Sequence, residues 1–137
     1  MTAVATIIRD ALEILRVVDA NEAPEAEDAE TAIRALNTMM RTWEVDGLSL
    51  GWSDVSSPAD ILPAPPEAEE PITYHLAIRL RPRYGAALEP DVVQIATAGM
   101  SMLRAQMALN SYARLSYPDL PAGSGQGRAT YRDGLNG

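Results

Sequence analysis

The 137-residue sequence contains no cysteine, no phenylalanine and no lysine, and it has a single histidine. Without cysteine, the chain can form neither a disulfide, nor a thiolate metal site, nor a cysteine nucleophile. Without phenylalanine, the core must come mainly from Ala, Leu, Ile, Val and Met. No apolar run approaches the roughly 20 residues that span a bilayer. Arg9 and Asp10 interrupt the first apolar stretch, which argues against a signal peptide. We therefore expect one cytosolic, non-membrane domain with a modest core.

Charge is distributed unevenly along the chain, whose formal net charge is −8. Residues 1–70 carry 4 Arg and 15 Asp or Glu, for a net −11, whereas residues 71–137 carry 7 Arg and 4 Asp or Glu, for a net +3. This polarity favours head-to-tail self-association or binding to a charged partner. The overall acidity argues against independent, sequence-specific DNA binding.

Apolar residues recur at helical spacing in four segments, which predicts an all-α fold, a small bundle of about four helices. The expected helices cover residues 4–18, 24–46, 72–81 and 90–116. Trp43 lies in phase with the apolar face of the second helix and is expected in the core, and Asp46-Gly47 is expected to end that helix. Pro82 is expected to end the third helix and to expose Arg81 and Arg83 at a turn. Ile95 and Met102 are expected on the buried face of the fourth.

A long proline-rich loop separates the second and third helices. Residues 53–71 contain five prolines, which argues against a helix or a central strand there. Residues 48–52 alternate with period two, so a short hairpin with the segment around residue 61 is one possibility. Long loops within small domains are often functional. The candidate contact residues in this loop are Leu50, Trp52, Ile61 and Leu62.

The C-terminal residues 117–137 form a segment rich in Pro, Gly and Ser that keeps tyrosines, leucines and arginines. Such a segment cannot bury enough apolar surface to fold alone. It is either an unstructured terminus or an extended arm, distinct from a helical body of residues 1–116, that becomes ordered on a partner. Candidate anchors on such an arm are Tyr117, Pro118, Leu120, Pro121, Gly123, Ser124, Gly125, Arg128, Tyr131 and Arg132.

The sequence offers little that would support catalysis. His75 lies in an apolar helical stretch without His or Cys partners, which favours a packed histidine over a metal ligand. Glycines 123, 125 and 127 are not followed by a helix, as a phosphate-binding loop requires. Glu44 and Asp46 lie next to Trp43 in the sequence and would allow a two-carboxylate hydrolase, although nothing in the sequence specifies one. We expect no catalytic residue, no metal and no cofactor.

Four segments, taken in order, resemble the head-to-tail adaptors of tailed bacteriophages, closest to the tail accessory, or packaged-DNA stabilisation, proteins of short-tailed phages. They are Ile7–Leu15, Met39–Gly47 with its Trp three residues before Asp-Gly, Leu76–Gly85 with its Pro-x-Tyr turn, and Tyr117–Gly125. The resemblance covers nearly the whole helical body and the first half of the arm. Residues 53–71 depart from the family pattern.

The resemblance implies a structural virion protein at the head–tail junction, assembled in the host cytoplasm and not an enzyme. Its copies would form a ring, usually of twelve subunits, below the portal protein. The ring would extend the DNA channel, help retain packaged double-stranded DNA without reading its sequence, and dock a tail hub, nozzle or further connector. In that setting the arm would bind the portal, and the loop 48–66 would contact a ring neighbour or the tail.

The channel wall of such a ring is expected to be mainly polar and acidic, because a basic lining would hold DNA rather than let it pass. Arg81 and Arg83 are the candidate exceptions. Two alternatives remain open on the sequence. One is a virion-associated cell-wall hydrolase that uses carboxylates, and the other is a small DNA-packaging factor of the small-terminase type.

Overall fold

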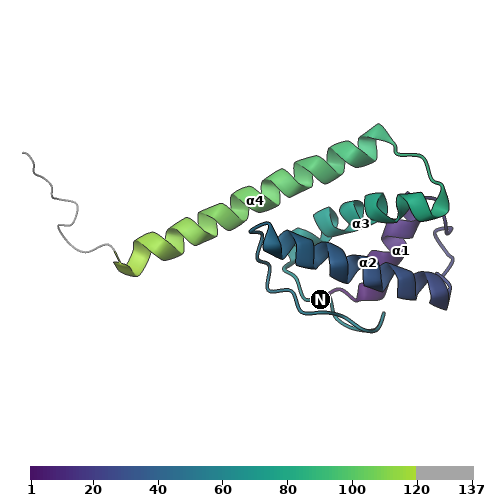
Figure 1. The fold of residues 1–137 in the computed structure, drawn as a ribbon, viewed down its shortest axis with the longest axis horizontal. Coiled ribbons are helices and arrows are strands. Elements are labelled where there is room, and N and C mark those ends of the chain that lie inside the picture. The colour runs from purple at the N-terminus through teal and green to yellow at the C-terminus, as the bar shows by residue number, and fades with distance from the viewer. Residues whose placement is uncertain (120–137) are drawn as a thin grey trace, which may run out of the picture. The chain divides into compact units, whose positions relative to one another are not determined.

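The computed structural model describes the backbone of residues 1–119 and side chains through residue 111. The chain forms two units, residues 1–104 and residues 105–137. The described residues form four α-helices and one 3-10 turn: α1 (Val4–Ile14), α2 (Ala26–Val45), η1 (Pro66–Ala68), α3 (Glu69–Tyr84) and α4 (Pro90–Asp119) (Figure 1). Over the described range there is no sheet, and a single antiparallel bridge joins Ala3 to Ile61. The all-α prediction is confirmed.

Helix α3 lies at the centre of the first unit, where it packs against both α1 and α2. The first half of α4 runs back along α3. His75 on α3 reaches the carbonyl of Ala96, and Pro71, one turn earlier, lies against Gly99. A Cβ added at Gly99 would come within 3.1 Å of the Pro71 ring, so the absence of a side chain allows this close approach. The most deeply buried large side chains come from the first three helices: Val4, Ile8, Leu12, Leu36, Met39, Met40, Ile72, Leu76 and Leu80.

Trp43 is a core residue, as its phase on α2 predicts. Its side chain is only 6% exposed, and its ring meets the His75 ring edge-on, with the centroids 5.4 Å apart. Gly47 adopts a positive φ of 99°, and the amide of Leu48 donates to the Trp43 carbonyl at 2.9 Å. This left-handed cap ends α2 where the sequence predicts.

The first helix is shorter than predicted. It ends at Ile14 rather than at residue 18 because Arg16 adopts a left-handed conformation, with φ at 61°. The amides of Arg16 and Val17 then donate to the carbonyls of Glu13 and Leu12, which closes the last turn. Arg16 carries a side chain in a region that favours glycine, so no glycine marks this stop in the sequence. The second helix also begins two residues later than expected, at Ala26 rather than at Pro24.

Two prolines that were expected to exclude or end α3 lie within it. Pro71 is the third residue of the helix, where the backbone amide has no partner inside the helix, so its missing N–H costs nothing. Pro82 lies in the last turn, and the helix continues past it to Tyr84, ending at Gly85 with a φ of 63°. The predictions that residues 53–71 exclude helix and that Pro82 ends α3 were therefore wrong.

Residues 48–52 do not form the hairpin that their alternation suggested. Instead, Ile61 pairs with Ala3, and the loop docks on the start of α1. The amides of Val4 and Ala5 donate to the carbonyls of Asp60 and Pro58 at 2.8 and 2.9 Å. The first amides of a helix lack partners within it, so the loop satisfies two of them. This long-range pairing has no signal in a local sequence pattern.

Helix α4 extends to Asp119, so the backbone of Tyr117 and Pro118 is helical and not part of an extended segment. Its predicted buried face is only partly confirmed. Ala96 and Leu103 are buried, whereas Ile95 and Met102 are exposed. The proposed boundary between a body of residues 1–116 and an arm of residues 117–137 stays a prediction, because residues 120–137 lie outside the described part of the chain.

The buried position of Trp43 leads to a prediction about stability. Trp43→Ala should lower the free energy of unfolding by roughly 3–5 kcal/mol, because it leaves a large cavity beside His75. Urea unfolding followed by circular dichroism would measure the change. Val45→Ala, at an exposed position near the end of the same helix, is the control and should stay within about 0.5 kcal/mol. Equal stability of the two variants would contradict the core assignment.

Candidate functional site

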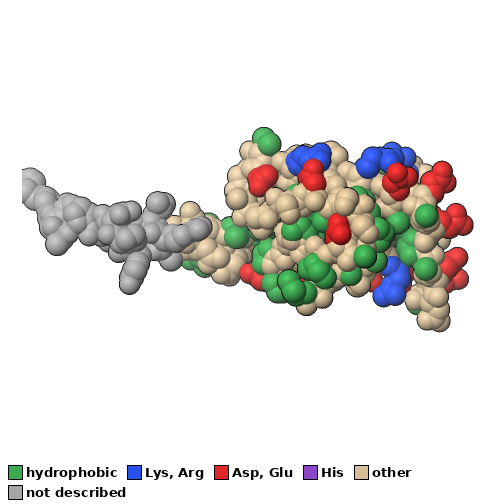
Figure 2. All heavy atoms as spheres, turned by 90° about the horizontal axis from the view of Figure 1, so that it is seen from below, with side chains coloured by type: hydrophobic (Ala, Val, Ile, Leu, Met, Phe, Trp, Pro, Cys, Tyr) green, Lys and Arg blue, Asp and Glu red, His purple; other side chains and the backbone are tan. Residues whose placement is uncertain are grey.

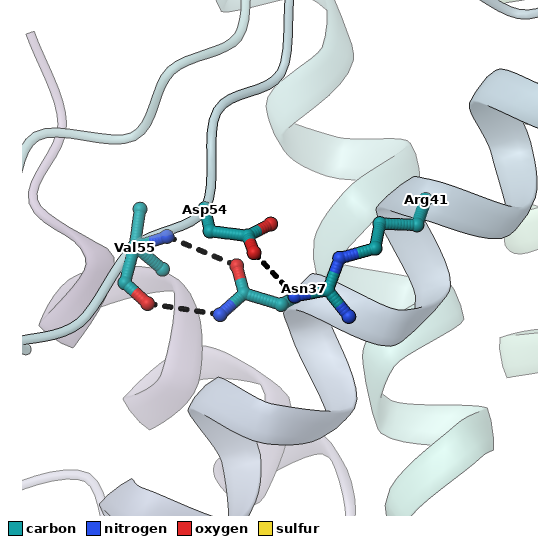
Figure 3. A network of polar contacts seen from close by, with 4 residues as sticks. All are labelled: Asn37, Arg41, Asp54 and Val55. Carbon is teal, nitrogen blue, oxygen red and sulfur yellow. Dashed lines mark hydrogen bonds and ion pairs between the residues drawn. The ribbon is translucent and has the colours of Figure 1, made fainter.

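The proline-rich loop is fixed to α2 by one buried side chain, Asn37. Its Nδ2 donates to the carbonyl of Val55 at 2.9 Å, and its Oδ1 accepts from the Val55 amide at 3.0 Å (Figure 3). Asn37 and Val55 are both buried. The amide side chain therefore pairs both backbone groups of one loop residue, as a neighbouring strand would. Sequence reasoning missed Asn37, because an isolated asparagine within a helical stretch carries no distinctive pattern.

Two further polar contacts hold the loop near this pair. One turn along α2, Arg41 forms an exposed ion pair with Asp54 (Figure 3). The carboxylate of Asp60 accepts from the amides of Ser56 and Ser57 at 2.9 and 3.0 Å. These backbone hydrogen bonds favour the charged form and lower the pKa of Asp60. The loop is thus an ordered part of the first unit, built to present a fixed surface.

The four loop residues predicted to make outside contacts fall into different environments. Leu62 is 5% exposed and belongs to the core, so within this structure it offers little surface for an outside contact. Leu50 and Trp52 are half-buried, and the Nε1 of Trp52 is buried without a hydrogen-bond partner among the described residues. Ile61 is exposed beside its bridge to Ala3. Of the four, Ile61 has the largest exposed fraction, 46%.

The two arginines flanking Pro82 also differ from each other. Arg81 is half-buried, and its Nη1 donates to the carbonyl of Ala86 at 3.2 Å, just beyond the end of α3. It stabilises the turn rather than projecting from it, so the expectation that Pro82 exposes both arginines was wrong for Arg81. Arg83 is exposed in the last turn of the helix. Next to it, the Tyr84 hydroxyl donates to Asp28 on α2 at 2.9 Å. Burial and this carboxylate raise the pKa of Tyr84 to about 12.

His75 is a packing residue that joins three helices. It lies on α3, meets Trp43 of α2 edge-on, and approaches the Ala96 carbonyl of α4 with its Nε2 at 3.0 Å. Burial is the main cause that lowers the pKa of His75 below its ordinary value of 6.5, and nearby Arg79 lowers it further, whereas the bond to Ala96 opposes the shift. The predicted role of a packed histidine agrees with this geometry.

The carboxylates considered for hydrolysis lie in open surroundings. Glu44 and Asp46 are both exposed at the C-terminal end of α2, and Asp46 pairs with Arg104 at 3.5 Å. Catalytic acids in glycoside hydrolysis depend on apolar surroundings that raise their pKa, and this site does not provide them. A second group of acids lines an open groove between α1 and α3, comprising Asp10, Glu13, Glu69 and Glu70. Among the described residues, no group of His, Cys, Asp or Glu is arranged to hold a metal ion.

The surface of the first unit combines hydrophobic, acidic and arginine side chains (Figure 2). The largest exposed apolar side chains on a helix are Met102 and Leu109 of α4, at 74% and 64%, together with Val45 at the end of α2. None of the described helices is long and apolar enough to cross a membrane. The candidate site consists of these exposed apolar side chains together with Ile61 of the loop.

Of the ten predicted anchors on the arm, the structure describes the backbone of two. Tyr117 and Pro118 belong to the helical backbone of α4. The other eight candidate anchors lie outside the described residues: Leu120, Pro121, Gly123, Ser124, Gly125, Arg128, Tyr131 and Arg132. Their role stays a prediction from the sequence.

The sequence model of the P22 tail accessory factor family matches residues 7–134. The chain belongs to the P22 tail accessory factor family. No curated protein sequence matches the chain at a significant level. Membership in this family assigns the protein a structural role in the phage tail, and thereby a place in the virion.

The Asn37–Val55 pair leads to a prediction about the stability of this tail accessory protein. Asn37→Ala should lower the free energy of unfolding by about 1–3 kcal/mol, because it leaves the buried amide and carbonyl of Val55 unpaired. Chemical unfolding measures the loss. Arg41→Ala, which removes the exposed ion pair next to it, should cost much less, because solvent screens an exposed pair. The assignment fails if the two variants lose stability equally.

The lowered pKa of His75 predicts a dependence of stability on pH. Because the unfolded chain binds this proton more readily than the folded one, stability should fall as the pH drops from about 7.5 to about 5.5, through the ordinary histidine range. The melting temperature of the parent protein should therefore fall more over this interval than that of His75→Gln, which has no group that titrates there. Identical pH profiles for the two proteins would show that burial of His75 does not control its protonation.

Proposed function

We propose that the protein is a head-to-tail connector subunit that assembles as a ring, of twelve copies, below the portal. The observation that carries the proposal is the match to the P22 tail accessory factor family over nearly the whole chain. In this role the ring extends the DNA channel, helps to retain packaged DNA and provides the docking surface for a tail hub, nozzle or next connector. The subunits assemble in the host cytoplasm and remain at the head–tail junction.

The surface features of the chain suit an assembly subunit. The first 70 residues are strongly acidic, and the remainder carries a net positive charge, so unlike ends of adjacent copies attract one another. The loop is held by Asn37 and by the start of α1, so its exposed residue Ile61 is presented in a fixed position. A preorganised surface loses less conformational entropy on binding than a flexible one. Ile61 is therefore the loop residue that we assign to a ring neighbour or to the tail.

Passage of DNA constrains the inner wall of such a ring. Each phosphate contact made by a basic residue adds affinity through counterion release, and many identical copies multiply that affinity. A wall of polar and acidic side chains lets DNA slide, with Arg83 as the exposed candidate for a weak contact. A ring with a continuous arginine belt in its lumen would contradict this assignment.

The arm leads to a direct test of the proposed function. Deleting residues 120–137 leaves all of α4 in place, so the helical content per molecule should be nearly unchanged. Binding to purified portal rings should be lost, because we assign the docking anchors Leu120, Arg128 and Tyr131 to this segment. Co-sedimentation of the truncated and full-length proteins with portal would measure the difference. Normal connector formation by the truncated protein would refute the docking role of the arm.

A further inference from the structure

One face of α4 carries large apolar side chains at a regular interval. Ile95, Met102 and Leu109 lie seven residues apart and are 38%, 74% and 64% exposed. Ala98 and Ala105 lie between them and are exposed as well. Residues spaced by three, four and seven positions share one face of a helix. These five residues therefore form one stripe, in which large and small side chains alternate.

The stripe is distinct from the face that α4 uses within its own chain. Contact with α3 is made by the Ala96 carbonyl, which meets His75, and by Gly99 against Pro71, and Ala96 and Leu103 are both buried. Ala96 and Leu103 lie roughly a third of a helical turn away from the stripe, at 100° per residue. Within the first unit, the stripe residues Ile95, Ala98 and Met102 are exposed. Large apolar side chains repeated along one exposed face mark an interaction surface more often than isolated ones do.

The stripe is also uncharged. Between Val92 and Ser111 the only charged residue is Arg104, and its guanidinium pairs with Asp46 of the same chain. The other helices present charges on their exposed faces, such as Arg9 on α1, Glu30 on α2 and Glu70 on α3. In a chain of net charge −8, α4 thus provides a long helical face on which a second acidic copy meets no like charge.

We propose that this stripe is the contact between neighbouring copies of this chain, an inference that rests on the proposed ring. The net charge of −8 makes identical subunits repel one another overall, although their acidic and basic segments attract locally. An uncharged apolar contact is where that repulsion is weakest and where burial of apolar surface is favourable. The alternation of large and small side chains provides holes between Ile95, Met102 and Leu109 that receive the side chains of a packed helix. DNA is not the occupant, because a phosphate backbone gains nothing from an apolar surface.

A matched pair of charge substitutions tests the contact. Met102→Glu places a charge in the middle of the stripe, and Thr97→Glu places the same charge on an exposed position of α4 outside it. Both single-chain proteins should keep their melting temperature, because both sites are exposed. On portal rings, Met102→Glu should lower the number of bound copies at a given concentration by at least about tenfold, whereas Thr97→Glu should assemble like the parent. Normal assembly of Met102→Glu overturns the proposal.

A second experiment identifies what covers the stripe. Since the chain has no cysteine, Met102→Cys offers a unique thiol for a photoreactive benzophenone maleimide, with Thr97→Cys as the control. After irradiation of the assembled complex, the labelled Met102→Cys protein should give a covalent product of two copies of this chain, several-fold more than the control. A product with the portal or the tail component instead, or no product above the control, overturns the proposal. If even the parent protein forms no ring, the proposed function and this contact fall together, whereas a normal ring with an unprotected stripe refutes the contact alone.

Discussion

Burial of α3 is the constraint on which the first unit depends. Its side chains Ile72, Leu76 and Leu80 are fully buried between α1, α2 and the first half of α4. Helices of this length are marginal on their own, so each is stabilised by the face it buries against α3. The Trp43–His75 contact and the bond from His75 to the Ala96 carbonyl then set the positions of α2 and α4 around this centre. A small core without phenylalanine is completed in this way by one tryptophan and one histidine.

The loop and α4 differ in how they are held against that core. The loop has no regular structure but is fixed by Asn37, by the Asp60 turn and by the amides at the start of α1. Helix α4 is regular but buries few of its side chains within the chain, and it leaves Met102 and Leu109 exposed. Both kinds of surface suit the proposed ring subunit. The loop is preorganised by polar contacts with the helices that hold it. The exposed face of α4 is apolar and would gain stability when a partner covers it.

Much of the fold could be predicted from local patterns, and the errors share a physical cause. Helical periodicity located all four helices, and Gly47 marked a true left-handed cap. The error at Pro71 arose because proline excludes helix only where its amide would be bonded or its ring would clash, and the first turn of a helix relaxes both conditions. Pro82 lies in the last turn, and the helix continues past it only as far as Tyr84. The hairpin prediction was wrong because the loop pairs with the start of α1, more than fifty residues away in sequence. On α4, periodicity identified an apolar helix but could not decide which of two apolar faces meets α3.

The measurement that tests the central claim most directly is the mass and electron-microscopy structure of the full chain mixed with purified portal rings. The account predicts that the protein binds the portal as a closed ring of twelve copies, with the α4 stripe of each copy covered by a neighbour. A chain that stays unbound at high concentration, or that binds as isolated single copies with the stripe in solvent, would contradict it.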